Sequence, residues 1–247
     1  MCEVLMCGRY THALTWSEIH HLAGLAFPVP KDNPKPNYNT APTQYCPVVL
    51  SDGAQIWGEY AYWGMIPPWW DKDLSDKKFN TINAKSEEIT SKATYRGSVK
   101  RHRCVVPANC FYEWRKSDKQ PFAIGLGDGH EGFRPFLMAG IWSHWTGTYK
   151  AAYFEAYSFT ILTREAGEKM ATVHTREPAI MTPEEVKPWL CDPLEDILPV
   201  IIQPTPSQLM RLYPVSSDVG KVSNNGAWLL TEVADKSVGQ SDDNLLI

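Results

Sequence analysis

The sequence predicts an α+β fold, a single domain of mostly antiparallel β-strands that form a barrel-like core with peripheral helices. Three observations predict this fold. The chain has 247 residues, which suits one large domain that buries most of its apolar surface. It is rich in aromatic residues, and its 19 prolines and 16 glycines divide it into short elements. Segments rich in β-branched and aromatic residues also outnumber helical patterns.

The helices are predicted from their N-terminal capping signals. Thr15–Glu18 has the Thr-x-x-Glu form of a capping box, so a short amphipathic helix should begin there and end near Gly24. Thr182–Glu185 and Thr205–Gln208 each place Thr at the N-cap, Pro at the first helical position and Glu or Gln at the third. These two motifs predict two later helices. The charged stretch 86–101 is also predicted to be helical.

Strands and loops fill most of the remaining chain. Residues 27–44 are too rich in proline for regular structure and should form an extended surface loop. The tail 231–247 has little periodicity and many Asp, Ser and Asn residues, so we expect it to be disordered. Strands are predicted at Pro47–Leu50, Gln55–Trp63, Arg103–Val106, Phe111–Arg115, Phe122–Leu126, Pro135–Ser143 and Glu155–Leu162.

Composition excludes several classes of protein. No apolar stretch approaches the roughly 20 residues of a membrane span, and the N-terminus lacks a signal-peptide pattern, so we expect a soluble cytoplasmic protein. The six cysteines never form Cys-x-x-Cys, which argues against a disulfide framework or a zinc site; no metal and no cofactor are expected. The net charge of −4 argues against whole-molecule attraction to nucleic acid, although a local basic patch could still bind phosphates.

Four short stretches carry polar residues that core packing would not require: Cys7–Arg9, Ile82–Lys85, Phe111–Trp114 and His174–Pro178. Each has an ordinary structural explanation. The Asn would cap a turn, the Glu would face solvent from a strand, the His would be a hydrogen-bonded structural residue, and the Cys a small buried group. Together, however, a thiol, a carboxylate, an amide and an imidazole are the components of an acid/base-assisted covalent site.

Motifs in a fixed order connect these stretches along nearly the whole chain. They are Cys7-Gly8-Arg9-Tyr10, Tyr38-Asn39-Thr40-Ala41-Pro42, Trp63-Gly64-Met65-Ile66-Pro67-Pro68-Trp69, Asn83-Ala84, Cys104-Val105-Val106-Pro107-Ala108, Phe111-Tyr112-Glu113-Trp114 and His174-Thr175-Arg176-Glu177-Pro178. In these motifs, residues 7–230 resemble the SOS-response-associated peptidase (SRAP) domain, whose members process abasic sites in single-stranded DNA. The resemblance implies the SRAP fold and an enzyme of the DNA damage response, with covalent DNA-linking, autopeptidase and lyase activities.

In that family the nucleophile is a cysteine directly after the initiator methionine, and the match here is Cys7. This sequence departs from the family pattern, because residues 1–6 precede the expected nucleophile. Three explanations are open. Translation could begin at Met6, the protein could cut itself between Met6 and Cys7, or the extension could be retained and the site inactive. We favour the first, because Met6-Cys7 recreates the family start.

By the resemblance, Cys7 is the nucleophile, Glu113 orients or deprotonates its α-amine, Asn83 holds the thiol and sugar, and His174 moves protons. The α-amine would form an imine with the abasic aldehyde, and the thiol would then close a thiazolidine ring. Lys85 stands where the family typically has arginine. Lysine keeps the positive charge but cannot make the bidentate contact of arginine with a phosphate, so its contribution to affinity should be smaller. The full set of predicted DNA contacts is Arg9, Asn39, Pro42, Trp69, Trp70, Lys85, Arg96, Thr163 and Arg176.

The predicted partner is single-stranded DNA that contains abasic sites, bound by a monomer that joins the nucleoid at damaged DNA. Of Trp69 and Trp70, we expect one exposed ring and one buried ring. Two other functions fit the same residues. A conventional cysteine peptidase would use Cys7, His174 and Asn83 without needing a free amine. A non-catalytic single-stranded DNA-binding module would use the basic and aromatic residues alone.

Overall fold

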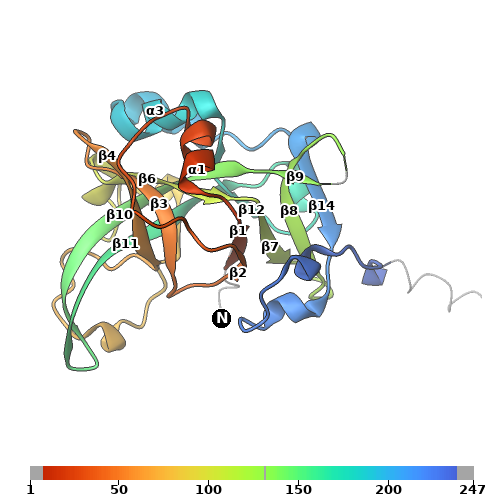
Figure 1. The fold of residues 1–247 in the computed structure, drawn as a ribbon, viewed down its shortest axis with the longest axis horizontal. Coiled ribbons are helices and arrows are strands. Elements are labelled where there is room, and N and C mark those ends of the chain that lie inside the picture. The colour runs from red at the N-terminus through yellow and green to blue at the C-terminus, as the bar shows by residue number, and fades with distance from the viewer. Residues whose placement is uncertain (1–7, 131, 238–247) are drawn as a thin grey trace, which may run out of the picture.

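In the part of the chain that the computed structural model describes, residues 8–130 and 132–237, the strands form two sheets (Figure 1). One sheet has the order β14-β8-β7-β1-β2, with β9 beside β8. The other has the order β12-β11-β4-β3-β6-β10-β13, with β5 beside β11. Because β10 also pairs with β11, the strands β11-β4-β3-β6-β10 close into a barrel. The predicted α+β barrel-like fold is confirmed.

The strands follow the chain in this order: β1 Arg9–His12, β2 Asn37–Thr40, β3 Tyr45–Ser51, β4 Ile56–Trp63, β5 Asn83–Lys85, β6 Arg103–Ala108, β7 Cys110–Trp114, β8 Pro121–Gly127, β9 Phe133–Arg134, β10 Phe136–Tyr149, β11 Ala152–Glu165, β12 Arg176–Pro178, β13 Ile180–Met181 and β14 Met210–Pro214. All seven predicted strands are present. Pairing is antiparallel except where β11 runs parallel to β4 and to β5.

The β10–β11 hairpin extends well beyond its predicted ends and projects from the barrel (Figure 1). Each strand has 14 residues. Tyr149 pairs with Ala152, so Lys150 and Ala151 form a two-residue turn with φ values of 52° and 63°. A tight hairpin turn needs this left-handed backbone, and Asn-Gly or Asp-Gly is its usual sequence signal. The hairpin was missed because that signal is absent.

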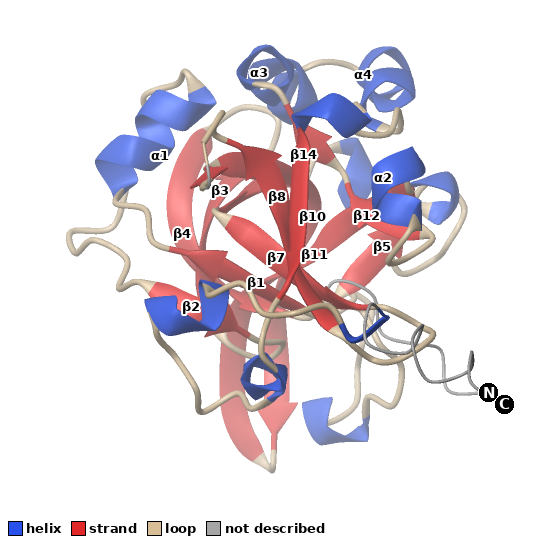
Figure 2. Ribbon diagram, turned by 90° about the vertical axis from the view of Figure 1, so that its right-hand side faces the viewer, coloured by secondary structure: helices blue, strands red, loops and turns tan. Residues whose placement is uncertain are grey.

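The helices are α1 Trp16–Ala23, α2 Glu168–Ala171, α3 Pro183–Cys191 and α4 Leu194–Ile201, all outside the barrel (Figure 2). The capping boxes predicted for α1 and α3 are both formed, and Gly24 ends α1 with a left-handed backbone. One core cluster fills the barrel interior. A second joins the outer face of the barrel sheet to α1, α3 and α4.

Two helix predictions are wrong. Residues 86–101 form isolated turns with short 3₁₀ segments at Ser86–Glu88 and Ser98–Lys100. Gly97 and several Ser and Thr residues disfavour a continuous helix there. The second capping motif gives only a 3₁₀ turn at Ser207–Leu209, because β14 begins at the next residue and pairs with β8.

The predicted loop 27–44 and the described part of the predicted tail, residues 231–237, are more ordered than expected. β2 lies inside the loop and pairs with β1, a tertiary contact that its proline-rich surroundings conceal. In the tail, Val233 N–H donates to the carbonyl of Pro214, and Asp235 forms an ion pair with Arg115. The ordered domain therefore continues past Leu230, and residues 238–247 lie outside the described residues.

Candidate active site

The carboxylate of the candidate site lies near the end of β7. Glu113 is only 2% exposed, so the alternative that it faces solvent is wrong. Side chains alternate along a strand, and Glu113 shares its face with Phe111, which belongs to the barrel core. β7 therefore places a carboxylate at the rim of the core.

The N-terminal strand brings the start of the domain beside this carboxylate. β1 pairs with β7 in the register Arg9–Tyr112 and Tyr10–Phe111, and Figure 2 shows the two strands side by side. Continued by one residue, this register sets Gly8 opposite Glu113. Cys7 lies outside the described residues, but it is bonded to Gly8. In the sequence, the predicted nucleophile thus comes two residues before Arg9, whose strand partner Tyr112 directly precedes Glu113.

The amide is held by β5, a short strand that runs parallel to β11. The carbonyl of Ile82 accepts from the Trp63 indole N–H at 3.0 Å and from the Ile161 N–H at 3.1 Å. The hydroxyl of Tyr95 donates to the carbonyl of Asn83 at 3.3 Å. Hydrogen bonds on both sides therefore fix the backbone that carries Asn83.

The imidazole follows α2. His174 is 6% exposed, and its Nδ1 accepts the backbone N–H of Arg176 at 3.1 Å. An Nδ1 acceptor places the proton of the neutral ring on Nε2, an assignment made from the hydrogen bond. Burial lowers the pKa of His174, and the charges of Lys116 and Arg176 lower it further. Near neutral pH, His174 is therefore a neutral donor through Nε2.

The chain neighbours of these three side chains meet in the barrel core. Phe111, Ile82 and Val173 belong to one core cluster, which also contains Tyr10. In addition, Lys116, just after β7, is near enough to His174 for its charge to lower the pKa of the imidazole. The segments that carry the predicted amide, carboxylate and imidazole therefore all pack on the same hydrophobic core as Tyr10 of β1.

Two predicted DNA contacts have structural roles at the other edge of this region. The guanidinium of Arg9 donates to Asn39 Oδ1 and to the carbonyl of Val219, each at 2.8 Å, and to that of Gly220 at 3.1 Å. Asn39 is buried, and its Nδ2 donates to three carbonyls of residues 219–224. Both side chains tie β1 and β2 to this loop. Their contact with DNA stays a prediction.

Arg176 is also engaged within the protein. Its two terminal nitrogens donate to the carboxylate of Glu87 at 2.7 and 2.8 Å, and Nη2 donates to the carbonyl of Thr163 at 2.6 Å. Thr163 itself is buried, with its hydroxyl 3.5 Å from the carbonyl of Ala84. These contacts bridge β12, β11 and the turn after β5.

The remaining predicted contacts lie at or near the surface. Lys85 is 3.9 Å from Glu88, and Arg96 is exposed. Trp69 is 52% exposed, whereas Trp70 is partly buried and its carbonyl accepts from the Trp145 indole. Of the expected pair of rings, one is therefore exposed and the other only half-buried.

Several residues near the site were not predicted. A cavity that includes Pro42 is also lined by Lys77, Phe79, Tyr62 and Tyr149. The dipeptide Lys77-Lys78 followed by Phe79 is a basic and aromatic cluster that could have indicated this surface. Among the described residues, no group of His, Cys, Asp or Glu could hold a metal ion.

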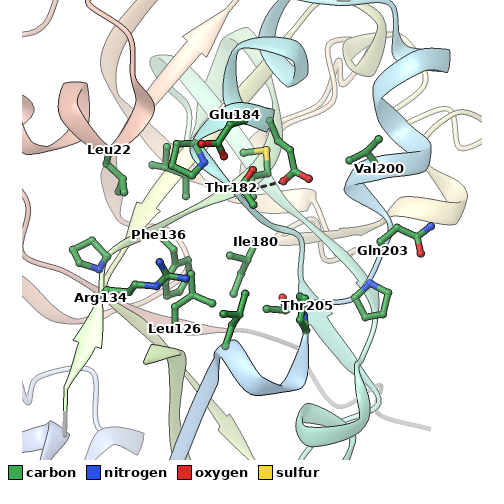
Figure 3. A pocket seen from close by; sticks show the side chains of 18 of the residues that line it. Leu22, Leu126, Arg134, Phe136, Ile180, Thr182, Glu184, Val200, Gln203 and Thr205 are labelled. Atoms are coloured by element: carbon green, nitrogen blue, oxygen red, sulfur yellow. Dashed lines mark hydrogen bonds between the residues drawn. The ribbon is translucent and has the colours of Figure 1, made fainter. Parts of the chain in front are cut away.

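A different cavity, of about 730 Å³, lies between α1, α3 and α4 (Figure 3). Its lining is largely apolar, with Ile180, Phe136 and Val200 among the side chains that point into it. Of the predicted site residues that the structure describes, none lines this cavity. No helix within residues 8–130 and 132–237 has the length and apolarity to cross a membrane.

The fold is a closed barrel whose N-terminal strand, β1, pairs with the strand that carries the buried Glu113. The SOS response associated peptidase (SRAP) family profile matches residues 6–222, and the chain belongs to that family. It is 34% identical to the abasic site processing protein YoaM of Bacillus subtilis (strain 168), over 91% of this chain and 97% of that protein. It is 30% identical to the abasic site processing protein HMCES of Xenopus tropicalis, over 87% and 73%.

The fold has a counterpart among solved structures. A protein from Bacteroides thetaiotaomicron superposes with a TM-score of 0.78 and 23% identity, covering 92% of this chain and all of that one. At this identity the likeness supports the fold alone.

Proposed function

We propose that this protein processes abasic sites in single-stranded DNA by linking itself covalently to them through Cys7. The relatives named above are abasic site processing proteins. The observation that carries the proposal is the burial of Glu113 opposite Gly8 in the β1–β7 register. A buried carboxylate on the strand residue that the register sets opposite Gly8 would be suited to hold or deprotonate a free α-amine at Cys7.

The chemistry starts at the α-amine. An N-terminal amine has a pKa of about 7.7 to 8.0, so part of it is neutral near pH 7. It adds to the aldehyde carbon of the open abasic sugar and expels water, forming an imine. The Cys7 thiolate then adds to the imine carbon, and the imine nitrogen takes a proton, which closes the five-membered thiazolidine. Glu113 would accept the amine proton in the first step.

The imidazole has a restricted role in this scheme. Because Nδ1 of His174 accepts a backbone N–H, only Nε2 is available to the sugar. The neutral ring would donate Nε2–H to the sugar oxygen that leaves C1′ during ring opening. Asn83 would hold the thiol and the sugar. Loss of the 3′ phosphate from the imine by β-elimination is a competing lyase reaction, which thiazolidine closure suppresses.

The proposal requires a free amine at Cys7. Initiation at Met6 followed by methionine removal would supply it, and so would self-cleavage of the Met6–Cys7 bond, which would be the peptidase activity. Intact mass of the protein purified from its native host reports which residue begins the mature chain. A chain that invariably keeps residues 1–6 and still forms the adduct would contradict the role of the α-amine.

A denaturing gel of protein incubated with an abasic oligonucleotide tests the proposed link directly. Protein that begins at Cys7 should give a covalent band, Cys7→Ala should give none, and Glu113→Gln should form it more slowly. Unchanged adduct formation in both variants would refute the assignment.

The same assay separates the two alternative functions. A DNA-binding module that does no chemistry would give no covalent band with any variant. For a conventional cysteine peptidase, acetylation of the α-amine should leave peptide cleavage intact. Under our proposal acetylation abolishes the adduct.

A further inference from the structure

The cavity that includes Pro42 adjoins the candidate site on the side of the β10–β11 hairpin. Its volume is about 510 Å³, within the range of pockets that bind small molecules. Pro42, Gly64 and Ile82 line it, together with the rings of Tyr62, Phe79 and Tyr149. Aromatic walls of this kind are surfaces on which unpaired bases stack.

Ile82 connects this cavity to the start of the domain. A β-carbon placed on Gly8 would lie 3.9 Å from the δ1 methyl of Ile82. On the cavity side, a β-carbon on Gly64 would lie 3.9 Å from Ile82 and 3.5 Å from the Tyr62 ring. One side chain therefore separates Gly8, next to Cys7, from the cavity.

Among the described residues that line the cavity, Lys77 is the one cation. Its Nζ lies 4.8 Å from the centroid of the Phe79 ring and donates to the carbonyl of Phe79 at 2.9 Å. No carboxylate of the described residues lies within ion-pair distance of Lys77. Burial lowers the pKa of Lys77 to about 8. A phosphate would replace the lost hydration of this ammonium with a charge-assisted hydrogen bond.

We propose that this cavity is a nucleotide subsite, in which Lys77 binds a backbone phosphate and the rings of Phe79 and Tyr62 take a base of the residue flanking the abasic position. The inference rests on the proposed function, because it assumes that DNA reaches the site. It goes beyond that function by assigning a binding role to residues outside the catalytic set. Ile82 would separate the two nucleotides. The abasic sugar would lie on the side of Ile82 that faces Gly8, and the neighbouring nucleotide on the side that lines the cavity.

Equilibrium binding of an undamaged single-stranded oligonucleotide tests the subsite without any covalent step. Lys77→Met should weaken binding and lower the slope of log affinity against log salt by about 0.7, the value for one phosphate contact on a single strand. The matched control is Lys78→Met, since Lys78 Nζ donates to the carbonyl of Ser75 and its side chain does not line the cavity. Lys77→Arg should restore the slope. Equal slopes for wild type, Lys77→Met and Lys78→Met would overturn the proposal.

The base contact has its own readout. A 2-aminopurine next to the abasic position should lose fluorescence when it stacks in the cavity, and Phe79→Leu should relieve that quenching. Equal quenching in wild type and Phe79→Leu would refute the base position. At saturating DNA, the control Lys78→Met should keep the wild-type yield of covalent adduct. If the wild type forms no covalent adduct but Lys77→Met still lowers the salt slope, the capture chemistry is refuted and the subsite is supported.

Discussion

Two arginine–glutamate pairs meet at consecutive residues of β12, yet they lie in opposite environments. Glu177 pairs with Arg164 inside the protein, where the two side chains are 0% and 4% exposed. Arg176 pairs with Glu87 at the surface, where they are 18% and 51% exposed. Neighbouring residues on a strand point to opposite faces, so Glu177 points into the interior while Arg176 points to the surface.

The buried pair is surrounded by further hydrogen bonds. Arg164 also donates to the carbonyls of Ile201 and Ile180 and to the hydroxyl of Thr205. Glu177 accepts the N–H groups of Thr205 and Gly167. The network therefore joins α4, β13 and the start of α2 to the segment that carries His174. Buried charges are tolerated when each is paired and hydrogen-bonded in this way.

The surface pair makes fewer contacts and remains accessible to water. It is bidentate, but half of the Glu87 side chain is exposed, and solvent screens such a pair. If Arg176 binds DNA as predicted, a phosphate would replace the carboxylate of Glu87. The comparison indicates that an arginine–glutamate pair stabilises the fold where it is buried, at Arg164–Glu177. At the surface, Arg176–Glu87 is a contact that another anion could replace.

The largest expected effect comes from breaking the buried pair. Glu177→Ala leaves Arg164 buried without its counter-charge, and should lower the free energy of unfolding by about 3–5 kcal/mol. Glu87→Ala is the matched control and should cost about 1 kcal/mol or less. Urea unfolding of both variants measures the difference. Similar losses of unfolding free energy in the two variants would contradict the conclusion that the buried pair stabilises the fold more than the surface pair does.

A smaller effect is expected on the imidazole. The charge of Arg176 contributes to lowering the pKa of His174, so Arg176→Gln should raise that pKa. Arg9→Gln serves as control, because Arg9 is not among the groups that shift the pKa of His174. A histidine whose pKa is lowered on folding binds protons better when unfolded. The protein therefore loses stability as the pH falls below the unfolded value of about 6.5, and Arg176→Gln should reduce this loss. NMR titration of His174 reports the shift, and an unchanged pKa would argue against the coupling.

The smallest effect is expected on DNA affinity. Glu87→Gln removes the acid that competes for Arg176, and should tighten binding of an undamaged oligonucleotide about two- to fivefold, equivalent to about 0.4–1 kcal/mol. Glu195→Gln is the control, because it removes the same charge from an exposed residue of α4 that forms no ion pair with the described residues. Fluorescence anisotropy would distinguish them. Equal gains would mean that net charge, and not release of Arg176, governs affinity.

Local sequence signals predicted much of the fold. The capping boxes at Thr15 and Thr182 began helices as expected, because each is complete within four residues. A similar motif at Thr205 did not, since that residue is bound by Arg164 and Glu177, and β14 follows at once. Local capping energy of about 1 kcal/mol is smaller than the cost of breaking a buried network.

The sequence by itself determined the strand pattern, two of the helices, the SRAP motifs and the types of residue at the candidate site. Only the tertiary structure decided that Arg176 pairs with Glu87 while Glu177 faces the interior, that Glu113 is buried, and that Lys77 lines a cavity beside Ile82. The reason is the range of the forces involved. Caps and strand alternation depend on residues a few positions apart, whereas ion-pair partners, burial and cavities depend on which distant segments pack together.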